Sequence, residues 1–278
     1  MPDLFEVIVK RWKLIAGLTL SATILAWIIS LFMPKEYVSV ATALPANSLT
    51  ADKARLFNNN IEALYSEIGL PDELDRMEGT ALLDTIFIAA ADRFDLPAHY
   101  HIKQNGDAFY KAVIKLKKNS NIHKSGYGEL KVKVWDENPE TASGLANALL
   151  QGIQQIHQHL QNERNMMVWQ KVCTEYEQKK KQYASLSDSA RSLSGAQAEM
   201  AMVNKTALLE QIKEYQNMIG QYQLAIKTNP PVLLTVEPAR PSIWPDKPRI
   251  LQTILITFFA ALIFSYVLAM FLETRIKS

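Results

Sequence analysis

The chain has 278 residues, of which 48% are hydrophobic, and its 30 basic and 28 acidic side chains give a formal net charge of +2. This near balance gives no electrostatic case for nucleic-acid binding. A single cysteine, Cys173, excludes an intrachain disulfide framework. Two apolar stretches near the ends leave enough chain between them for one domain with its own core.

The first apolar stretch covers residues 14–33 and ends at Pro34, so we expect a transmembrane helix there. Residues 1–13 carry apolar side chains at helical spacing and are expected to lie at the cytoplasmic membrane interface. A cleaved signal peptide is the alternative, but this run of about 20 residues exceeds the roughly 7–15 residues of a signal peptide's apolar region. Small or weakly polar residues allow close helix contact within the span: Gly17, Thr19 and Ser21.

The second apolar stretch, residues 250–272, contains no charged side chain. At about 1.5 Å per helical residue it is long enough to cross a hydrocarbon core of roughly 30 Å. A short tail, residues 273–278, follows. Basic side chains lie at the outer ends of the two spans, at Lys10, Arg11, Lys13, Arg275 and Lys277. The positive-inside rule therefore places both chain ends in the cytoplasm and residues 34–249 on the opposite side of the membrane.

An α/β base domain is predicted from residues 34–138 and 230–237. Residues 37–44 and 232–237 favour strands, and residues 129–136 alternate most clearly. The outer face of that last strand, Lys131, Lys133 and Trp135, is expected to face solvent or a partner.

Helical spacing covers residues 49–70 and 80–94 of the same domain, with Pro71 and Gly79 as breakers. A short helix from residue 107 is expected to pass into an alternating run that ends at Leu116, and a loop is expected over residues 119–128.

A long helical hairpin is predicted over residues 139–229. Asn138 is suited to cap its first helix and Pro139 to begin it. We expect helices over residues 139–186 and 196–227, joined by a serine-rich turn. The first helix has an irregular apolar seam of Leu149, Ile153, Ile156, Leu160, Met167, Val172, Tyr176, Tyr183 and Leu186. The return helix has a regular one for hairpin or oligomer packing, namely Leu208, Ile212, Tyr215, Ile219, Tyr222 and Ile226.

Prolines dominate residues 238–249, hereafter the proline segment, and favour an extended polyproline-like path. One interpretation is a spacer that holds the domain away from the lipid headgroups. The other is a rigid surface for a partner or the membrane interface, formed by Pro238, Arg240, Pro241, Trp244, Pro245, Lys247, Pro248 and Arg249. Both roles are compatible.

Motifs of catalytic and cofactor sites do not occur in the sequence: there is no nucleophile elbow, phosphate loop, H-E-x-x-H or C-x-x-C. We therefore expect no enzymatic activity, no cofactor and no metal. Two H-x-H pairs are present, His99 with His101 and His157 with His159. Residues two apart on a helix point about 200° from each other, so the second pair cannot hold a metal alone.

The order of these features resembles the Wzz-type polysaccharide co-polymerases, the chain length determinant family. The resemblance rests on the start DLFEVIVKRWKLI, the passage LKVKVWDENPETASGLANALLQGI, the hairpin and the prolines before the second span. Residues 250–272 lack the two spaced glycines of the family, so a contact of this span with the other span or with the polymerase is expected to use Ala260, Ala261 and Ser265 instead. No phosphate loop follows the second span, and we expect no fused kinase.

The resemblance implies an α+β membrane protein in which two transmembrane helices flank a periplasmic α/β base domain with a long helical hairpin. It implies a non-enzymatic co-polymerase in the inner membrane that regulates the chain length of an O-antigen, capsule or exopolysaccharide. Its partners would be further copies in a ring, a membrane-embedded polymerase and the growing polysaccharide. Two alternatives stay open: a co-polymerase or export subunit that modulates a separate kinase or transporter, and a periplasmic coiled-coil adaptor of a secretion system.

Overall fold

The computed structural model describes residues 4–46, 71–103, 106–190 and 194–277. The helix predicted over residues 49–70 lies outside these ranges. The chain divides into two compact units. We call the first, Met1–Ser39 with Val134–Gly144 and Arg240–Ser278, the terminal unit, and the second, Val40–Lys133 with Leu145–Ala239, the central unit.

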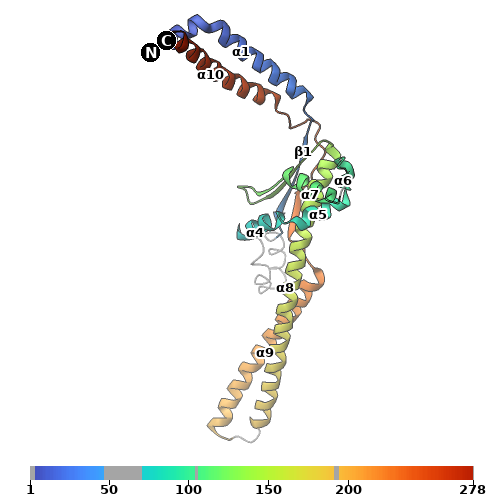
Figure 1. Cartoon of the computed structure of the whole chain (residues 1–278). Helices are drawn as coiled ribbons and strands as arrows, with labels where there is room; N and C mark the ends of the chain where they lie inside the picture. Colours follow the sequence, from blue (N-terminus) through green and yellow to red (C-terminus); the bar gives the residue numbers. More distant parts are fainter. Residues whose placement is uncertain (1–3, 47–70, 104–105, 191–193, 278) are drawn as a thin grey trace. The chain divides into compact units, whose positions relative to one another are not determined.

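Two apolar helices dominate the terminal unit. Helix α1 (Leu4–Phe32) and helix α10 (Ile250–Lys277) lie side by side, with the two chain ends at the same end of the pair (Figure 1). Arg11–Phe32 and Ile250–Leu272 are each long and apolar enough to cross a membrane. Both expected helices are therefore present. The backbone leaves helical geometry at Arg11, where φ is −115° and ψ is 18°, which separates the first helical turns from the span.

A four-stranded sheet has the order β2-β3-β1-β4. Its strands are β1 (Tyr37–Pro45), β2 (Ser120–Lys124), β3 (Leu130–Asp136) and β4 (Leu233–Glu237). β1 pairs antiparallel with β4, with Leu44 opposite Leu234 and an irregularity between Thr42 and Ala43. The three predicted strands are confirmed. The loop predicted over residues 119–128 is wrong at β2, because a polar strand at a sheet edge lacks the apolar alternation that reveals a half-buried strand.

Strand β3 has the alternating burial that its alternating sequence predicted. Leu130, Val132 and Val134 are fully buried on one face, while the residues between them are half-buried. Large side chains on the helices of the central unit are also fully buried, among them Phe87, Met77, Leu96, Leu116, Leu145, Leu149 and Ile153, as is Leu233 on β4. The core of the central unit is therefore built from helices around an alternating sheet.

Between residue 71 and the hairpin, the described residues form four short helices: α4 (Pro71–Ala81), α5 (Asp84–Arg93), α6 (Leu96–His99) and α7 (Ala108–Lys118). The break predicted at Gly79 is wrong. Gly79 lies inside α4, where the burial of Leu74 and Met77 offsets the roughly 1 kcal/mol helical cost of glycine. The other predicted breaker, Pro71, begins α4, where a missing N–H costs no hydrogen bond.

Helix α7 also corrects the alternating run predicted up to Leu116. Ala112, Val113 and Leu116 are buried, whereas Ile114 is exposed. This spacing of three and four residues is that of an amphipathic helix, and it is indistinguishable from alternation over so short a stretch.

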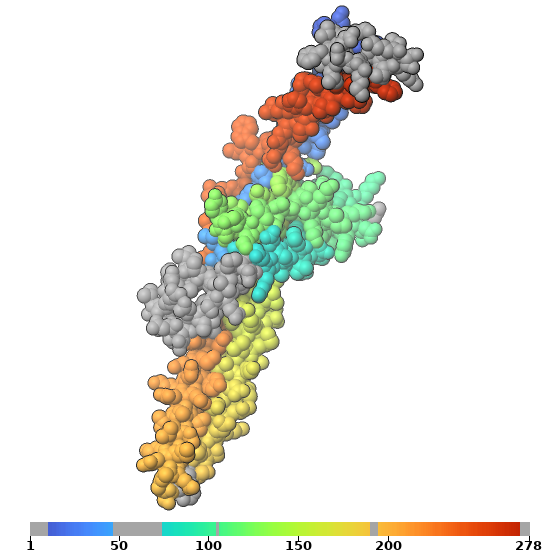
Figure 2. Space-filling view, turned by 90° about the vertical axis from the view of Figure 1, so that its left-hand side faces the viewer, coloured from blue at the N-terminus to red at the C-terminus, as the bar shows by residue number. Residues whose placement is uncertain are grey.

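The hairpin consists of α8 (Pro139–Ala190) and α9 (Ala196–Thr228), which lie side by side in Figures 1 and 2. The predicted cap is confirmed: the Asn138 side-chain oxygen accepts the N–H groups of Glu140 at 2.8 Å and Thr141 at 3.2 Å. Helix α8 has 52 residues and extends past the predicted end at Leu186. At about 1.5 Å per residue it is roughly 80 Å long.

Candidate partner and membrane interface

The proline segment is tied to the chain that leaves α1. Glu36 and Lys247 form an isolated antiparallel bridge. The Glu36 N–H donates to the Lys247 carbonyl at 3.0 Å, and the Asp246 N–H donates to the Glu36 carbonyl at 2.9 Å. Backbone bonds therefore join the chain that follows the first span to the chain that precedes the second.

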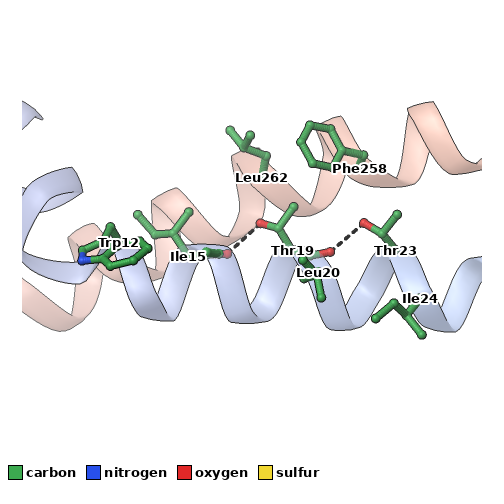
Figure 3. A pocket seen from close by; sticks show the side chains of 9 residues that line it. Trp12, Ile15, Thr19, Leu20, Thr23, Ile24, Phe258 and Leu262 are labelled. Carbon is green, nitrogen blue, oxygen red and sulfur yellow. Dashed lines mark hydrogen bonds between the residues drawn. The ribbon is translucent and has the colours of Figure 1, made fainter.

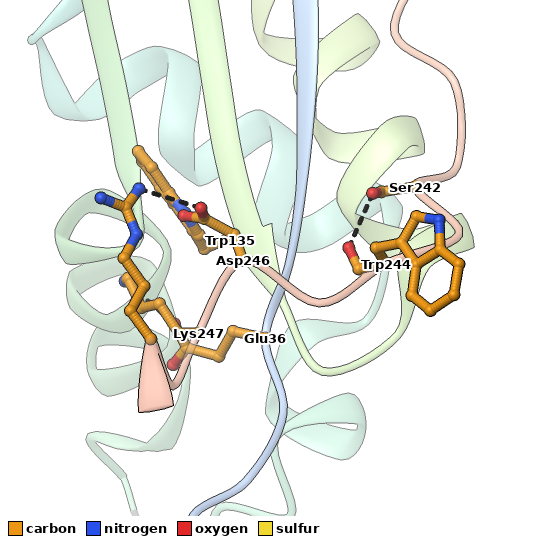
Figure 4. Close-up of polar contacts among 7 residues, drawn as sticks. Glu36, Trp135, Ser242, Trp244, Asp246 and Lys247 are labelled. Atoms are coloured by element: carbon orange, nitrogen blue, oxygen red, sulfur yellow. Dashed lines mark hydrogen bonds and ion pairs between the residues drawn. The ribbon is translucent and has the colours of Figure 1, made fainter. Parts of the chain in front are cut away.

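Side chains reinforce this junction. The Asp246 carboxylate accepts hydrogen bonds from the indole N–H of Trp135 at 2.8 Å and from the Arg249 guanidinium at 2.9 Å. The Lys247 ammonium is 3.0 Å from the Glu36 carboxylate and 4.8 Å from the centroid of the Trp135 ring. Figure 4 shows Glu36, from the chain just before β1, close to Lys247 of the proline segment, and Trp135 of β3 close to Asp246. We call Glu36, Trp135, Asp246, Lys247 and Arg249 the junction cluster.

Electrostatics keep the junction cluster ionised. The hydrogen bond from Trp135 lowers the pKa of Asp246, with further lowering by Arg249 and Lys247, while burial opposes the shift. Asp246 therefore stays a carboxylate at neutral pH. Two carboxylates face two cations, so the cluster is balanced in charge.

The residues predicted as an interface are mostly accessible. Pro248 is half-buried and the rest are exposed, namely Pro238, Arg240, Pro241, Trp244, Pro245, Lys247 and Arg249. Lys247 and Arg249 are engaged in the junction cluster, whereas Trp244 extends away from it in Figure 4. Their role toward a partner stays a prediction.

Sequence reasoning missed Glu36 and Asp246 as members of this site. It noted Trp135 on the outer face of its strand but had no means of finding its acceptor, 111 positions away along the chain. The available signal was the single carboxylate of the proline segment, Asp246, which lies between two prolines and is followed by Lys247 and Arg249.

Among the described side chains of the two spans, one pair of hydroxyls is in polar contact. The hydroxyls of Thr19 and Ser265 are 3.2 Å apart and are buried, with exposed fractions of 5% and 0%. These two residues confirm their predicted place in the helix contact. Gly17 and Ser21 do not, because they are exposed. Ala260 is exposed too, so for this residue only the predicted contact with the polymerase stays a prediction. Gly17 and Ser21 are two positions from Thr19, which places them on the other side of the helix.

An apolar groove of about 530 Å³ lies beside this contact. Figure 3 shows it lined by α1 and α10, with Trp12 at one end and Phe258 and Leu262 opposite Thr19 and Thr23. Its walls are suited to an acyl chain or another apolar helix.

The predicted apolar seams of the two hairpin helices agree with the structure to different degrees. All six predicted seam residues of α9 are half-buried, as expected for a face that packs on another helix. On α8 the prediction fails at Leu160 and Met167, which are exposed. Gln161 and Asn165 are buried instead, because they continue the face of Ile153 at multiples of four residues.

Strongly exposed apolar side chains lie along both hairpin helices: Leu160, Met166, Met167, Met200, Met202, Val203, Leu209 and Leu224. Among the described residues, the side-chain oxygen of Gln161 and the indole N–H of Trp169 are buried without a hydrogen-bond partner. The hairpin thus exposes apolar surface and buries polar groups.

The histidine pair of α8 is split. His157 shares a hydrogen bond with the Thr80 hydroxyl, and burial lowers its pKa. His159 is exposed and lies 3.3 Å from the Glu163 carboxylate. Across the part of the chain that the structure describes, no three His, Cys, Asp or Glu side chains gather where a metal ion could bind.

Comparison with known proteins gives a family match at the N-terminus. Residues 1–74 match the family described as Wzz, chain length determinant protein. Over these residues the match agrees with the family that the sequence resembles, and it gives no support to the predicted alternatives. The comparison with curated proteins gives no match.

Three solved structures are similar at low identity. A full-length bacterial polysaccharide co-polymerase is 14% identical with a TM-score of 0.41, covering 100% of this chain and 98% of that one. A fragment of WzzB, a polysaccharide co-polymerase from Salmonella Typhimurium, is 15% identical with a TM-score of 0.29, covering 77% of this chain and 100% of that one. A mutant of the Shigella flexneri lipopolysaccharide O-antigen chain-length regulator WzzBSF is 14% identical with a TM-score of 0.27, covering 76% and 100%.

Proposed function

We propose that this chain, whose residues 1–74 match the Wzz chain length determinant family, is a non-enzymatic polysaccharide co-polymerase. It regulates the chain length of a surface polysaccharide, and the family match is the observation that carries the assignment. The chemistry of polymerisation belongs to a separate, membrane-embedded polymerase.

The mechanism is scaffolding by several copies. Monomeric soluble domains rarely expose large contiguous apolar patches, yet Met202 and Val203 are 72% and 69% exposed on α9, near further exposed apolar side chains. A neighbouring copy would bury this surface. Copies that repeat the same head-to-tail contact form a closed ring when the rotation from one copy to the next divides a full turn evenly. Such a ring would set how long a growing polysaccharide stays with its polymerase.

The two apolar helices support placement in the inner membrane, with residues 34–249 in the periplasm. The outward side chains of α1 and α10 are apolar and exposed, among them Leu25, Ile29, Leu255 and Phe259. They are suited to lipid or to a helix of the polymerase. The basic residues at the outer ends of both spans favour cytoplasmic chain ends.

Deletion of the gene, followed by electrophoresis of the cell's surface polysaccharide, tests the proposal. We expect polymer to persist while its preferred length is lost, and complementation with the full chain to restore that length. A polysaccharide of unchanged preferred length in the deletion strain would overturn the proposal.

A further inference from the structure

Two neighbouring apolar side chains stand out in the proline segment. Ile243 is 85% exposed and Trp244 is 79% exposed. Of the described residues of the terminal unit outside α1 and α10, they are the most exposed large apolar side chains. Such exposure next to a span is unfavourable in water, because burial of a large apolar side chain lowers its free energy.

The fold prevents these side chains from folding inward. The Ser39 hydroxyl donates to the Arg240 carbonyl at 2.9 Å on one side, and the bridge between Glu36 and Lys247 holds the other. Between these ties, the Ser242 hydroxyl donates to the Trp244 carbonyl at 2.9 Å and shapes a turn. Prolines at 241 and 245 restrict the backbone further. The exposure is therefore imposed by structure.

Chain length places the turn near the bilayer surface. Trp244 precedes Ile250, the first residue of α10, by six positions, so its Cα lies within about 20 Å of that residue even if the chain is fully extended. The bridge at Glu36 also brings the segment to within four residues of Phe32, the last residue of α1. Both spans therefore hold the turn close to the same face of the membrane.

The surrounding charges are compatible with lipid headgroups. The two carboxylates of the junction cluster are each paired with a cation, Glu36 with Lys247 and Asp246 with Arg249. The exposed side chains of Lys35 and Arg240 add positive charge on either side of the junction. Paired acids and accessible cations favour contact with anionic phosphate groups.

From these observations we propose that the turn at residues 242–245 is a membrane-interface anchor. Ile243 and Trp244 insert among the phospholipid headgroups, where an amphipathic indole is favoured because its ring is apolar and its N–H stays hydrated. Through the junction cluster, the anchor fixes the proline segment to the bilayer surface. The inference depends on the two spans crossing the membrane and on no property of the polysaccharide.

Nitroxide scanning of the full chain tests the anchor. In a Cys173→Ser background, Ile243→Cys and Trp244→Cys are labelled in vesicles of phosphatidylethanolamine and phosphatidylglycerol. Tyr127→Cys is the matched control, because Tyr127 is 89% exposed on the turn between β2 and β3. We expect oxygen collisions to exceed collisions with a water-soluble nickel chelate at positions 243 and 244, and the reverse at 127.

Two outcomes would overturn the proposal. Labels at 243 and 244 that behave like the one at 127 would place the turn in water. Labels that are shielded from both collision reagents would place it against protein, as in contact with a second copy or the polymerase.

Tryptophan fluorescence gives a second readout without a label. The chain has five tryptophans, and phospholipids brominated near the headgroup quench those at matching depth. We expect Trp244→Phe to reduce the quenched part of the emission relative to the unsubstituted chain. An unchanged quenched part would contradict insertion of Trp244.

Discussion

The terminal unit and the hairpin differ in where their polar and apolar side chains lie and in whether the polar ones have partners. In the terminal unit, Asp246, Glu36 and the hydroxyls of Thr19 and Ser265 all find partners within one chain. In the hairpin, Gln161 and Asn165 are buried while methionines and a valine face outward. In the first region these polar groups are satisfied within one chain, and the exposed apolar surface of α1 and α10 suits lipid. The second resembles half of an interface, so oligomerisation should depend on the hairpin.

The largest effect is expected from charges on the exposed hairpin surface. Met202→Glu combined with Val203→Glu should abolish oligomers, because two carboxylates would be buried unpaired between copies. The free energy of unfolding should change by only about 0.5 kcal/mol per site, as for other surface substitutions. Size-exclusion chromatography with light scattering in detergent measures the assembly.

Lys213→Glu is the control for that double variant, since it adds a negative charge at an exposed position of the same helix. It should leave the oligomer intact. If the double variant assembled like the unsubstituted chain, the exposed apolar surface of the hairpin would not be the contact between copies.

The next effect concerns the junction cluster. Asp246→Ala should destabilise the terminal unit by about 1–3 kcal/mol, because Trp135 and Arg249 each lose their acceptor. Urea unfolding in detergent, followed by tryptophan emission, measures this loss. Asp246→Asn keeps an acceptor for the indole and should cost less. Equal stability of all three proteins would show that the cluster does not hold the segment.

A smaller, pH-dependent effect is expected where α8 meets α4. Burial lowers the pKa of His157 in the folded chain, so the unfolded chain binds a proton first as the pH falls. Stability should therefore be constant above about pH 6.5, the ordinary histidine value, and decline below it. His157→Gln should reduce this decline in urea unfolding measured between about pH 8 and pH 5. A decline of the same size in the variant would assign it to other groups.

The smallest effect is expected between the spans. A double-mutant cycle of Thr19→Val and Ser265→Ala should give a coupling energy of about 0.6 kcal/mol, the usual worth of a hydrogen bond between helices in a membrane. Ser21→Ala is the control, because Ser21 is exposed and bonds only to the Leu18 carbonyl of its own helix. Unfolding in mixed detergent micelles measures the cycle. A coupling indistinguishable from zero would refute the contact.

Local patterns were sufficient for much of the fold. The two apolar helices, the alternation of β3, the Asn138 cap and the two long helices of the hairpin depend on neighbours within one element, and each was predicted. Prediction from local sequence failed at the edge strand β2, because its polar residues do not alternate with apolar ones. It also failed at Gly79, where burial of neighbouring side chains outweighs the low helix propensity of glycine.

The sequence by itself determined which segments are apolar, which are periodic and where prolines prevent regular structure, because these are properties of adjacent residues. Only the tertiary structure decided that Trp135 meets Asp246, that Glu36 meets Lys247 and that Gln161 faces inward on α8. Contacts between distant positions depend on strand order and helix rotation, and no single stretch of chain encodes either. The exposure of Ile243 and Trp244 follows from those same long-range ties.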